Sequence, residues 1–297
     1  MTDASPAQVL RYTAFSADPG GGNPAGVVLD ATGLADHEMQ AIAAEVGYSE
    51  TAFLFPGPPP GPTPHKAGRR KDQRTFRVRY FSPEAEVTFC GHATIASAVA
   101  LAERTGPGDL VFHTPAGTVP VTVTVDGAGR PRATLTSVEP RVEDAAPEVV
   151  AEACAALGWK PSELDAALPP RIAYAGARHL VLAAATRERL ADLSYDFSRL
   201  AGLMRQEDLT TLQLVWRESA TTFHVRDPFP VGGVVEDPAT GAAAAAFGAY
   251  ARETGLVPGA AVLTLHQGAD MGRPSTLTVE LRAGDPRVRV SGTGARI

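Results

Sequence analysis

Five side chains in this sequence have the types and surroundings needed for acid–base chemistry. Glu50 stands at the mouth of an apolar strand, where partial burial makes a carboxylate a better base toward a C–H bond. Cys90 and His92 flank a glycine, and Asp237 and Thr240 precede a second glycine. A thiol titrates at about 8.5 and can act as a base, whereas an alcohol cannot do so comparably. The set therefore favours an enzyme that moves a proton at carbon.

Four of these residues also have an ordinary structural interpretation. Glu50 could be a strand-end glutamate in solvent, as most glutamates are. Cys90 could be a small buried spacer, and His92 a residue of a first helical turn. Asp237, just before a proline, could be a helix N-cap, alone or in addition to a catalytic role.

An internal repeat relates the two glycine segments. Laying Gly91 on Gly241, a shift of about 150 residues, places Cys90 on Thr240. The shift is close to half the chain, so we expect two similar lobes.

An alanine-rich helix follows each glycine, over residues 93–103 and 242–253. Small side chains let strands approach closely, so we expect both helices to be central and buried on all sides. The first N–H groups of a helix lack internal partners and attract an anion, so the two starts could bind a substrate carboxylate. The candidate substrate-binding residues at these starts are Cys90, Gly91, Thr240, Gly241 and Ala242.

Composition excludes several classes of partner. The net charge of −6 argues against nucleic acid, and the one basic run, residues 65–71, is interpreted as a solvated loop. No segment approaches the roughly 20 apolar residues that span a bilayer, so no membrane partner is expected. The first residues lack a charged segment followed by an apolar one, so we expect a cytoplasmic protein.

No cofactor and no metal are expected. The two cysteines, Cys90 and Cys154, form neither a disulfide framework nor a metal-binding motif, and Cys154 is interpreted as a packed apolar residue. Glycines 20–22 lack the Lys-Ser/Thr of a phosphate loop. There is no dinucleotide fingerprint and no His/Cys/carboxylate cluster at ligand spacing, so nicotinamide, flavin, pyridoxal and metal ions are not expected.

Strand-like alternation interrupted by two long helices in each lobe predicts an α+β class. Helices are expected over 34–46, 146–157 and 190–204 as well as at the two central positions. We expect an N-terminal lobe over 1–120, which the last strand (286–297) could complete, and a C-terminal lobe over 121–285.

Six short segments, in order along the chain, together resemble the phenazine-biosynthesis PhzF-like family, within the diaminopimelate epimerase/proline racemase fold. The segments are Gly22-Asn23-Pro24-Ala25-Gly26-Val27, Ser49-Glu50-Thr51-Ala52-Phe53, Gly91-His92-Ala93-Thr94, Gly176-Ala177-Arg178-His179, Glu236-Asp237-Pro238-Ala239-Thr240-Gly241 and residues 267–275, beginning Gln267-Gly268-Ala269-Asp270.

The resemblance implies a cofactor-free isomerase of two pseudo-symmetric lobes, each a mixed or antiparallel sheet wrapped round a central helix. It further implies a homodimer and a site in the cleft between the lobes. In the family, a glutamate at the position of Glu50 takes a proton from a carbon of a dihydro-hydroxyanthranilate and returns it elsewhere in the conjugated system. Residues at the positions of His92 and Asp237 assist. Arg178 and His179 could line the cleft or be structural.

Two departures from the family pattern separate the enzymatic hypotheses. Ala242 stands where the family often has serine, which removes one hydroxyl contact. Cys90 stands where the racemase branch has the first of two opposed cysteines, but Thr240 occupies the second position. Two-base racemisation is therefore disfavoured. A one-sided epimerase or dehydratase using Cys90 with Thr240 stays open as an alternative, as does a non-catalytic small-molecule binder.

Overall fold

A computed structural model describes residues 8–57 and 74–297, and the chain divides into two compact units. The first unit extends to Leu135 and also contains Gly292–Ile297, while the second is Thr136–Ser291. The sequence placed the division at residue 120. The structure places it after residue 135, because the strand that spans residue 120 and the strand that follows it stay paired within the first unit. The basic run at 65–71 falls outside the described residues.

The first unit is built on a mixed sheet. Its strands follow the order β17-β1-β2-β3-β4-β6-β7-β8, in which β2–β3 and β4–β6 are parallel and the other neighbours antiparallel. A short strand, β5, pairs with the end of β4. The strands are β1 (Val9–Ala14), β2 (Asn23–Val28), β3 (Thr51–Pro56), β4 (Arg74–Phe81), β5 (Glu86–Val87), β6 (Gly108–Thr114), β7 (Gly117–Val125), β8 (Pro131–Thr136) and the end of β17 (Asp285–Arg296).

The second unit repeats this arrangement. Its order is β9-β10-β11-β12-β13-β15-β16-β17, with β11–β12 and β13–β15 parallel and the rest antiparallel. Here β14 pairs with the end of β13, as β5 does with β4. The strands are β9 (Arg141–Asp144), β10 (Arg171–Tyr174), β11 (Arg178–Ala183), β12 (Thr211–Arg217), β13 (Thr222–Pro228), β14 (Glu236–Asp237), β15 (Ala261–Gln267) and β16 (Ser275–Arg282). The repeat that the glycine segments suggested thus extends to the topology of both sheets.

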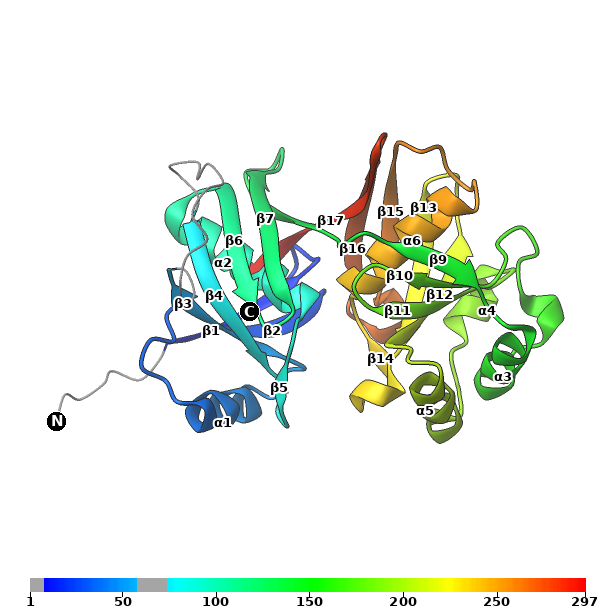
Figure 1. The fold of residues 1–297 in the computed structure, drawn as a ribbon, viewed down its shortest axis with the longest axis horizontal. Coiled ribbons are helices and arrows are strands. Elements are labelled where there is room, and N and C mark those ends of the chain that lie inside the picture. Colours follow the sequence, from blue (N-terminus) through cyan, green and yellow to red (C-terminus); the bar gives the residue numbers. More distant parts are fainter. Residues whose placement is uncertain (1–7, 58–73) are drawn as a thin grey trace. The chain divides into compact units, whose positions relative to one another are not determined.

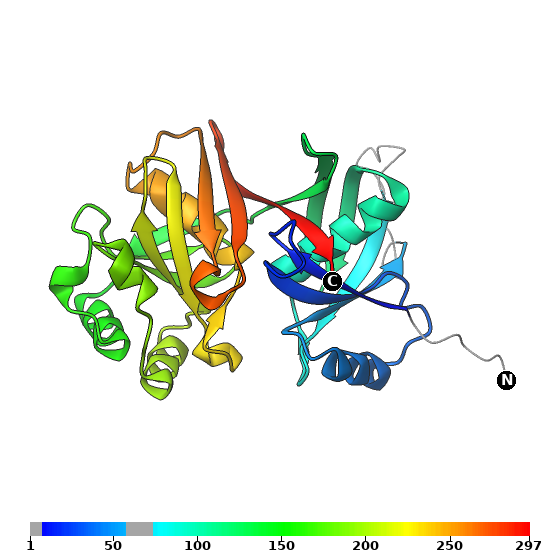
Figure 2. The ribbon, with the colours of Figure 1, turned by 180° about the vertical axis from the view of Figure 1, so that it is seen from behind.

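Each unit has one central helix, α2 (Gly91–Thr105) or α6 (Gly241–Glu253). In α2 every residue from His92 to Ala102 is buried, and in α6 every residue from Ala243 to Ala251. Each helix is surrounded by strands of its own sheet (Figures 1 and 2). Alanine makes this possible because it occupies little space and favours the helix. The expectation of two central helices buried on all sides is confirmed over these residues, while both helices end in exposed residues.

Smaller helices cover the outer faces of the sheets (Figure 1). In the first unit, Met39 and Ala43 of α1 (Asp36–Val46) pack on Phe53 and Phe81. In the second unit, α3 (Pro147–Leu157), α4 (Arg187–Ala191) and α5 (Phe197–Gln206) contribute to a separate apolar core. Cys154 is buried in that core, as expected. Within the described residues, three short 3₁₀ turns complete the elements: η1 (Pro161–Glu163), η2 (Pro230–Gly232) and η3 (Ala269–Met271).

The single helix expected over 190–204 is wrong. The chain leaves the helical conformation after Ala191 and starts again at Phe197. Asp196 causes the restart, because its carboxylate accepts a hydrogen bond from the backbone N–H of Arg199 at 2.9 Å. Of the helices that the structure describes, none has the length and apolarity needed to cross a membrane.

Candidate active site

Glu50 immediately precedes β3. Helix α1 ends at Gly47, whose φ of 71° lies in the left-handed region that favours glycine, and the chain then turns back toward the sheet. The carbonyl of Glu50 accepts a hydrogen bond from the N–H of Gly26 on β2 at 3.1 Å. The backbone is therefore fixed, while the side chain keeps 18% of its surface exposed. A partly buried carboxylate in a fixed position can reach a bound substrate.

Cys90 and His92 bring two further reactive groups to Glu50. Cys90 is the N-cap residue of α2, and its side chain makes no capping hydrogen bond. Its Sγ lies 3.5 Å from Oε2 of Glu50 and 3.4 Å from Nδ1 of His92. Nε2 of His92 lies 3.3 Å from the same carboxylate oxygen. Thiol, imidazole and carboxylate are thus in mutual contact within the first unit.

This contact corrects one argument drawn from the sequence. No His/Cys/carboxylate cluster was visible at ligand spacing, because Glu50 is far from Cys90 and His92 along the chain. The fold brings one donor atom of each within 4.8 Å of the others. Ser49, which sequence reasoning gave no role, adds its hydroxyl at 3.3 Å from Nε2 of His92.

The corresponding position of the second unit carries a different set of groups. Thr240 is the N-cap residue of α6, and its hydroxyl donates to Oδ2 of Asp237 at 2.6 Å. Asp237 lies on β14 and is not itself the N-cap residue. The two side chains are partly exposed. They offer a carboxylate and a hydroxyl, but no thiol.

Gln267 and Asp227 hold this pair in place, and sequence reasoning assigned neither of them a role. Oε1 of Gln267 accepts from the N–H of Thr240 at 3.0 Å, and its Nε2 donates to the carbonyl of Asp237 at 2.8 Å. The same Nε2 lies 2.8 Å from Oδ2 of Asp227. Gln267 opens one of the six family-like segments, and Asp227 is a charged residue at the end of a buried strand. These two features were the sequence signals that could have pointed to Gln267 and Asp227.

Asp227 is fully buried, and burial raises the pKa of its carboxyl group well above its ordinary value. The neighbouring carboxylates of Asp237 and Glu236 raise this pKa further. Oδ1 of Asp227 has no hydrogen-bond partner among the residues that the structure describes. The environment therefore favours the neutral acid beside the Asp237–Thr240 pair.

The remaining predicted residues lie as follows. Gly91 and Ala242 are half-buried and Gly241 is buried, each in the first turn of its helix. Arg178 forms an ion pair with Glu143 at 2.6 Å.

His179 is wholly buried, with Nδ1 at 2.8 Å from the hydroxyl of Thr211. Burial lowers the pKa of His179 to about 3, so the imidazole is neutral at physiological pH. These contacts favour the structural interpretation of His179.

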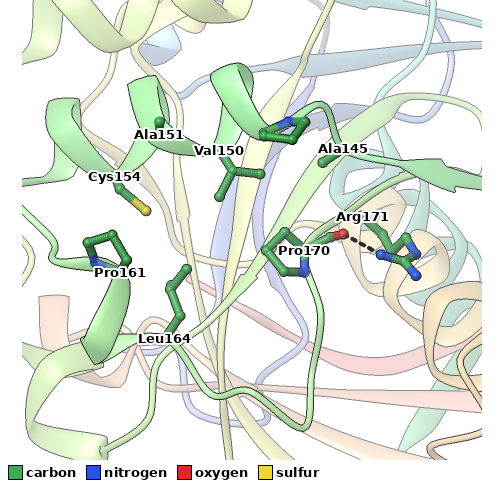
Figure 3. Close-up of a pocket in the computed structure, with 9 residues that line it drawn as sticks. Ala145, Val150, Ala151, Cys154, Pro161, Leu164, Pro170 and Arg171 are labelled. Carbon is green, nitrogen blue, oxygen red and sulfur yellow. Dashed lines mark hydrogen bonds between the residues drawn. The ribbon is translucent and has the colours of Figure 1, made fainter.

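A hollow of roughly 360 Å³ in the second unit lies beside α3 (Figure 3). Its lining is apolar except for Arg171, whose guanidinium donates to the carbonyl of Pro170 at 2.9 Å and pairs with Asp144. None of the candidate catalytic residues is among the lining residues, and burial raises the pKa of the one thiol there, Cys154. The hollow is therefore a poor candidate for proton transfer at carbon.

Comparison with known proteins shows which family this chain is similar to. Residues 12–297 match the family described as phenazine biosynthesis-like protein (PhzC-PhzF). An uncharacterized isomerase from Mesorhizobium japonicum is 36% identical, over 92% of this chain and 89% of its own length. The trans-2,3-dihydro-3-hydroxyanthranilate isomerase of Pseudomonas aeruginosa is 28% identical, over 95% of this chain and 94% of its own.

A solved structure extends the similarity to the fold. The crystal structure of a PhzF-family phenazine biosynthesis protein from Bacillus anthracis aligns with a TM-score of 0.81 and 25% identity, and covers 98% of this chain and 97% of that chain. The similarity therefore spans both units rather than one motif.

Proposed function

Because the chain belongs to the phenazine biosynthesis-like PhzF family, a family of isomerases, we propose that it isomerises a small carboxylated metabolite without a cofactor and that Glu50 is the base at carbon. The observation that supports this most is the contact of the Glu50 carboxylate with the imidazole of His92 and the thiol of Cys90. A non-catalytic binder has no need of these three reactive groups at one point.

The proposed reaction conserves all atoms. Glu50 accepts the proton as a substrate C–H bond breaks, and the electron pair moves into the adjacent conjugated system. A double bond shifts, and the proton returns to a different carbon. His92 lies 3.3 Å from the accepting oxygen and adjusts its hydrogen bonding as that oxygen gains and loses the proton. General acid–base help of this kind contributes about 10²–10⁴-fold to the rate.

We propose that the substrate carries a carboxylate next to the conjugated system, as trans-2,3-dihydro-3-hydroxyanthranilate does. In this proposal the candidate carboxylate-binding groups are the first backbone N–H groups of the central helices, at Gly91 in one unit and at Gly241 and Ala242 in the other, because such groups lack intrahelical partners. Asp237 assists catalysis, and Thr240 contributes a hydroxyl contact.

A thiolate mechanism is the second candidate, because Sγ of Cys90 contacts both Glu50 and His92. In that case Cys90 would be the base of an epimerase or dehydratase. Thr240 fits this candidate poorly, since its hydroxyl is already donated to Asp237 and an alcohol is a weak base.

The test is Glu50→Gln, with Glu45→Gln on the exposed side of α1 as the matched control. Deuterium incorporation at carbon is followed by NMR in D₂O, first with trans-2,3-dihydro-3-hydroxyanthranilate and then with related unsaturated carboxylic acids. Turnover should fall at least about 100-fold in Glu50→Gln and stay unchanged in Glu45→Gln. Near-normal turnover in Glu50→Gln, with its fold intact by circular dichroism, would remove Glu50 from the mechanism.

A further inference from the structure

We infer that Glu50, Cys90 and His92 form a binding site for a thiophilic divalent cation, of which Zn²⁺ is the type, and that the cation inhibits the enzyme rather than assisting it. Each residue offers a different donor: a carboxylate oxygen, a thiolate sulfur and an imidazole nitrogen. Zinc accepts all three, and sites with three protein ligands keep a fourth position open.

The distances between the donor atoms carry the inference. In a tetrahedral zinc site with ordinary bond lengths, sulfur lies about 3.6 Å from a nitrogen or oxygen ligand, and nitrogen about 3.4 Å from oxygen. Here Sγ of Cys90 lies 3.5 Å from Oε2 of Glu50 and 3.8 Å from Nε2 of His92, and Nε2 lies 3.3 Å from Oε2. A cation can therefore enter with only small side-chain adjustments.

The charges and the burial of these three groups also favour the binding of a divalent cation. A thiolate and a carboxylate together balance one divalent cation, while the imidazole binds as a neutral ligand. Cys90 and His92 are 7% and 6% exposed, so a neutral complex fits this environment better than an uncompensated cation would. Sulfur ligation selects zinc-like cations and disfavours Mg²⁺ and Ca²⁺, which prefer oxygen ligands.

The equivalent position of the second unit lacks these donors. Thr240 replaces Cys90, Ala242 replaces His92, and Thr210, which precedes β12 as Glu50 precedes β3, replaces the carboxylate. Within residues 8–57 and 74–297, the fold brings three or more such donors together at one place, formed by Glu50, Cys90 and His92. We therefore expect one cation per chain.

Direct binding tests the inference without any substrate. Metal-free protein is titrated with Zn²⁺ by calorimetry, with Mg²⁺ as the comparison cation. Co²⁺ is then added as a spectroscopic probe, because a thiolate ligand gives a near-ultraviolet charge-transfer band. We expect one Zn²⁺ per chain, no comparable heat with Mg²⁺ and a thiolate–cobalt band.

Variants assign the ligands. Outer-shell substitutions at metal sites cost about 10–100-fold in affinity, so Cys90→Ser and Glu50→Gln should each weaken Zn²⁺ binding by at least about 100-fold. Cys90→Ser should also abolish the cobalt band. Cys154→Ser, a substitution at the other buried cysteine, should leave the Zn²⁺ affinity and the cobalt band unchanged. Circular dichroism of the metal-free variants checks their fold. A wild type without the band, or Zn²⁺ affinity unchanged in a folded Cys90→Ser protein, overturns the inference.

Inhibition of the enzyme by Zn²⁺ is tested in a separate experiment, and this part of the inference rests on the proposed function. Zn²⁺ should suppress turnover of the wild type, and EDTA should restore it, because the bound cation occupies the base. If Glu50→Gln keeps its turnover, the catalytic proposal fails while the cation site stands on its binding data. If the cobalt band is missing while Glu50→Gln is inactive, only the cation site fails.

Discussion

Cys90 and Thr240 occupy equivalent positions at the starts of the two central helices, but their side chains make different contacts. Thr240 donates its hydroxyl to Asp237 at 2.6 Å. Cys90 contacts two titratable side chains, Glu50 and His92. From the sequence, we expected Cys90 either to pack as a spacer or to act as a base. The contacts place its thiol directly beside the proposed base, so its substitution distinguishes the two mechanisms.

We predict that Cys90→Ala lowers kcat by less than about tenfold, because the substitution removes a neighbour of Glu50 without removing the base. The measurement is steady-state turnover on the substrate identified in the D₂O screen. Thr240→Val provides the comparison in the second unit and should raise KM more than it lowers kcat. A collapse of turnover in a folded Cys90→Ala protein would favour the thiolate mechanism over the Glu50 mechanism.

The sequence located most of the reactive groups but not their partners. Glu50, Cys90 and His92 were identifiable because each stands in a distinctive local segment. Their convergence was not, because it depends on how β3 and α2 pack. The role of Asp227 could not be predicted for a related reason. That role depends on the burial of its carboxyl group and on its contact with the amide of Gln267, which is distant along the chain.

At the scale of elements, an equivalent Arg–Glu ion pair in each unit supports the short strand before the central helix. Arg79 on β4 makes two hydrogen bonds to Glu86 on β5, at 2.7 and 2.6 Å. Arg226 on β13 makes two to Glu236 on β14, at 2.9 and 2.5 Å. The second pair is buried, whereas Glu86 keeps 34% of its side chain exposed. The pairs fix the strands that lead to Cys90 and to Asp237.

We predict unequal costs for breaking the two pairs. Glu236→Gln should lower the free energy of unfolding by about 3–5 kcal/mol, since it leaves the buried Arg226 without its counter-charge. Glu86→Gln should cost about 1 kcal/mol or less, because the pair is more exposed and Arg79 keeps Asp36 as a partner. Urea unfolding of both variants gives the comparison. Equal losses would contradict this account of the two strands.

The packing of α6 gives a second prediction at this scale. A Cβ at Gly248 would lie 2.6 Å from Cγ1 of Val279 and 2.9 Å from Cγ1 of Val288, whereas one at Gly202 on α5 would meet nothing within 4 Å. Gly248→Ala should therefore destabilise the protein by about 1–3 kcal/mol. Gly202→Ala should stabilise it by roughly 0.5–1 kcal/mol through helix propensity. Thermal unfolding of the two single variants decides it, and a stabilised Gly248→Ala protein would refute the close approach of α6 to its sheet.

Local sequence signals predicted which helices exist better than they predicted where each helix begins and ends. The central helices followed from alanine content and from the repeat. The break between α4 and α5 did not, because apolar residues continue through it and Asp196 acts as a cap only once the chain has turned. The parallel pairs within each sheet also lay beyond the sequence, since strand order is a property of the assembled fold.

At the scale of the whole molecule, one strand serves both units. Asp285–Ser291 of β17 belongs to the second unit, where it pairs with β16, and Gly292–Ile297 belongs to the first. There the end of β17 lies against β1, with Tyr12 opposite Arg296 and Ala14 opposite Gly294. The division into units is therefore not a single cut in the sequence. The homodimer implied by the family resemblance stays a prediction.

We predict that a chain ending at Ser291 loses stability chiefly in the first unit. The truncation removes one of the two strands that pair with β1, and β2 stays as the other. The lost contacts include the hydrogen bonds from Phe15 N–H to the Thr293 carbonyl at 2.8 Å and from Ile297 N–H to the Arg11 carbonyl at 2.9 Å. The truncation also removes Gly292, which packs against the buried ring of Phe15. β1 would then pair with β2 alone, and the exposed N–H and C=O groups of such an edge strand promote aggregation.

Amide hydrogen exchange should therefore show protection lost on the side of β1 that pairs with β17, while the β15–β16 pair keeps its protection, since strand pairing in the second unit ends before residue 292. A chain ending at Arg296 is the control, because it lacks only the half-exposed Ile297 and its one hydrogen bond and should keep nearly full protection. Uniform loss of protection across both units would show instead that they unfold as one cooperative body. Unchanged protection of β1 would show that the shared strand contributes little to the first unit.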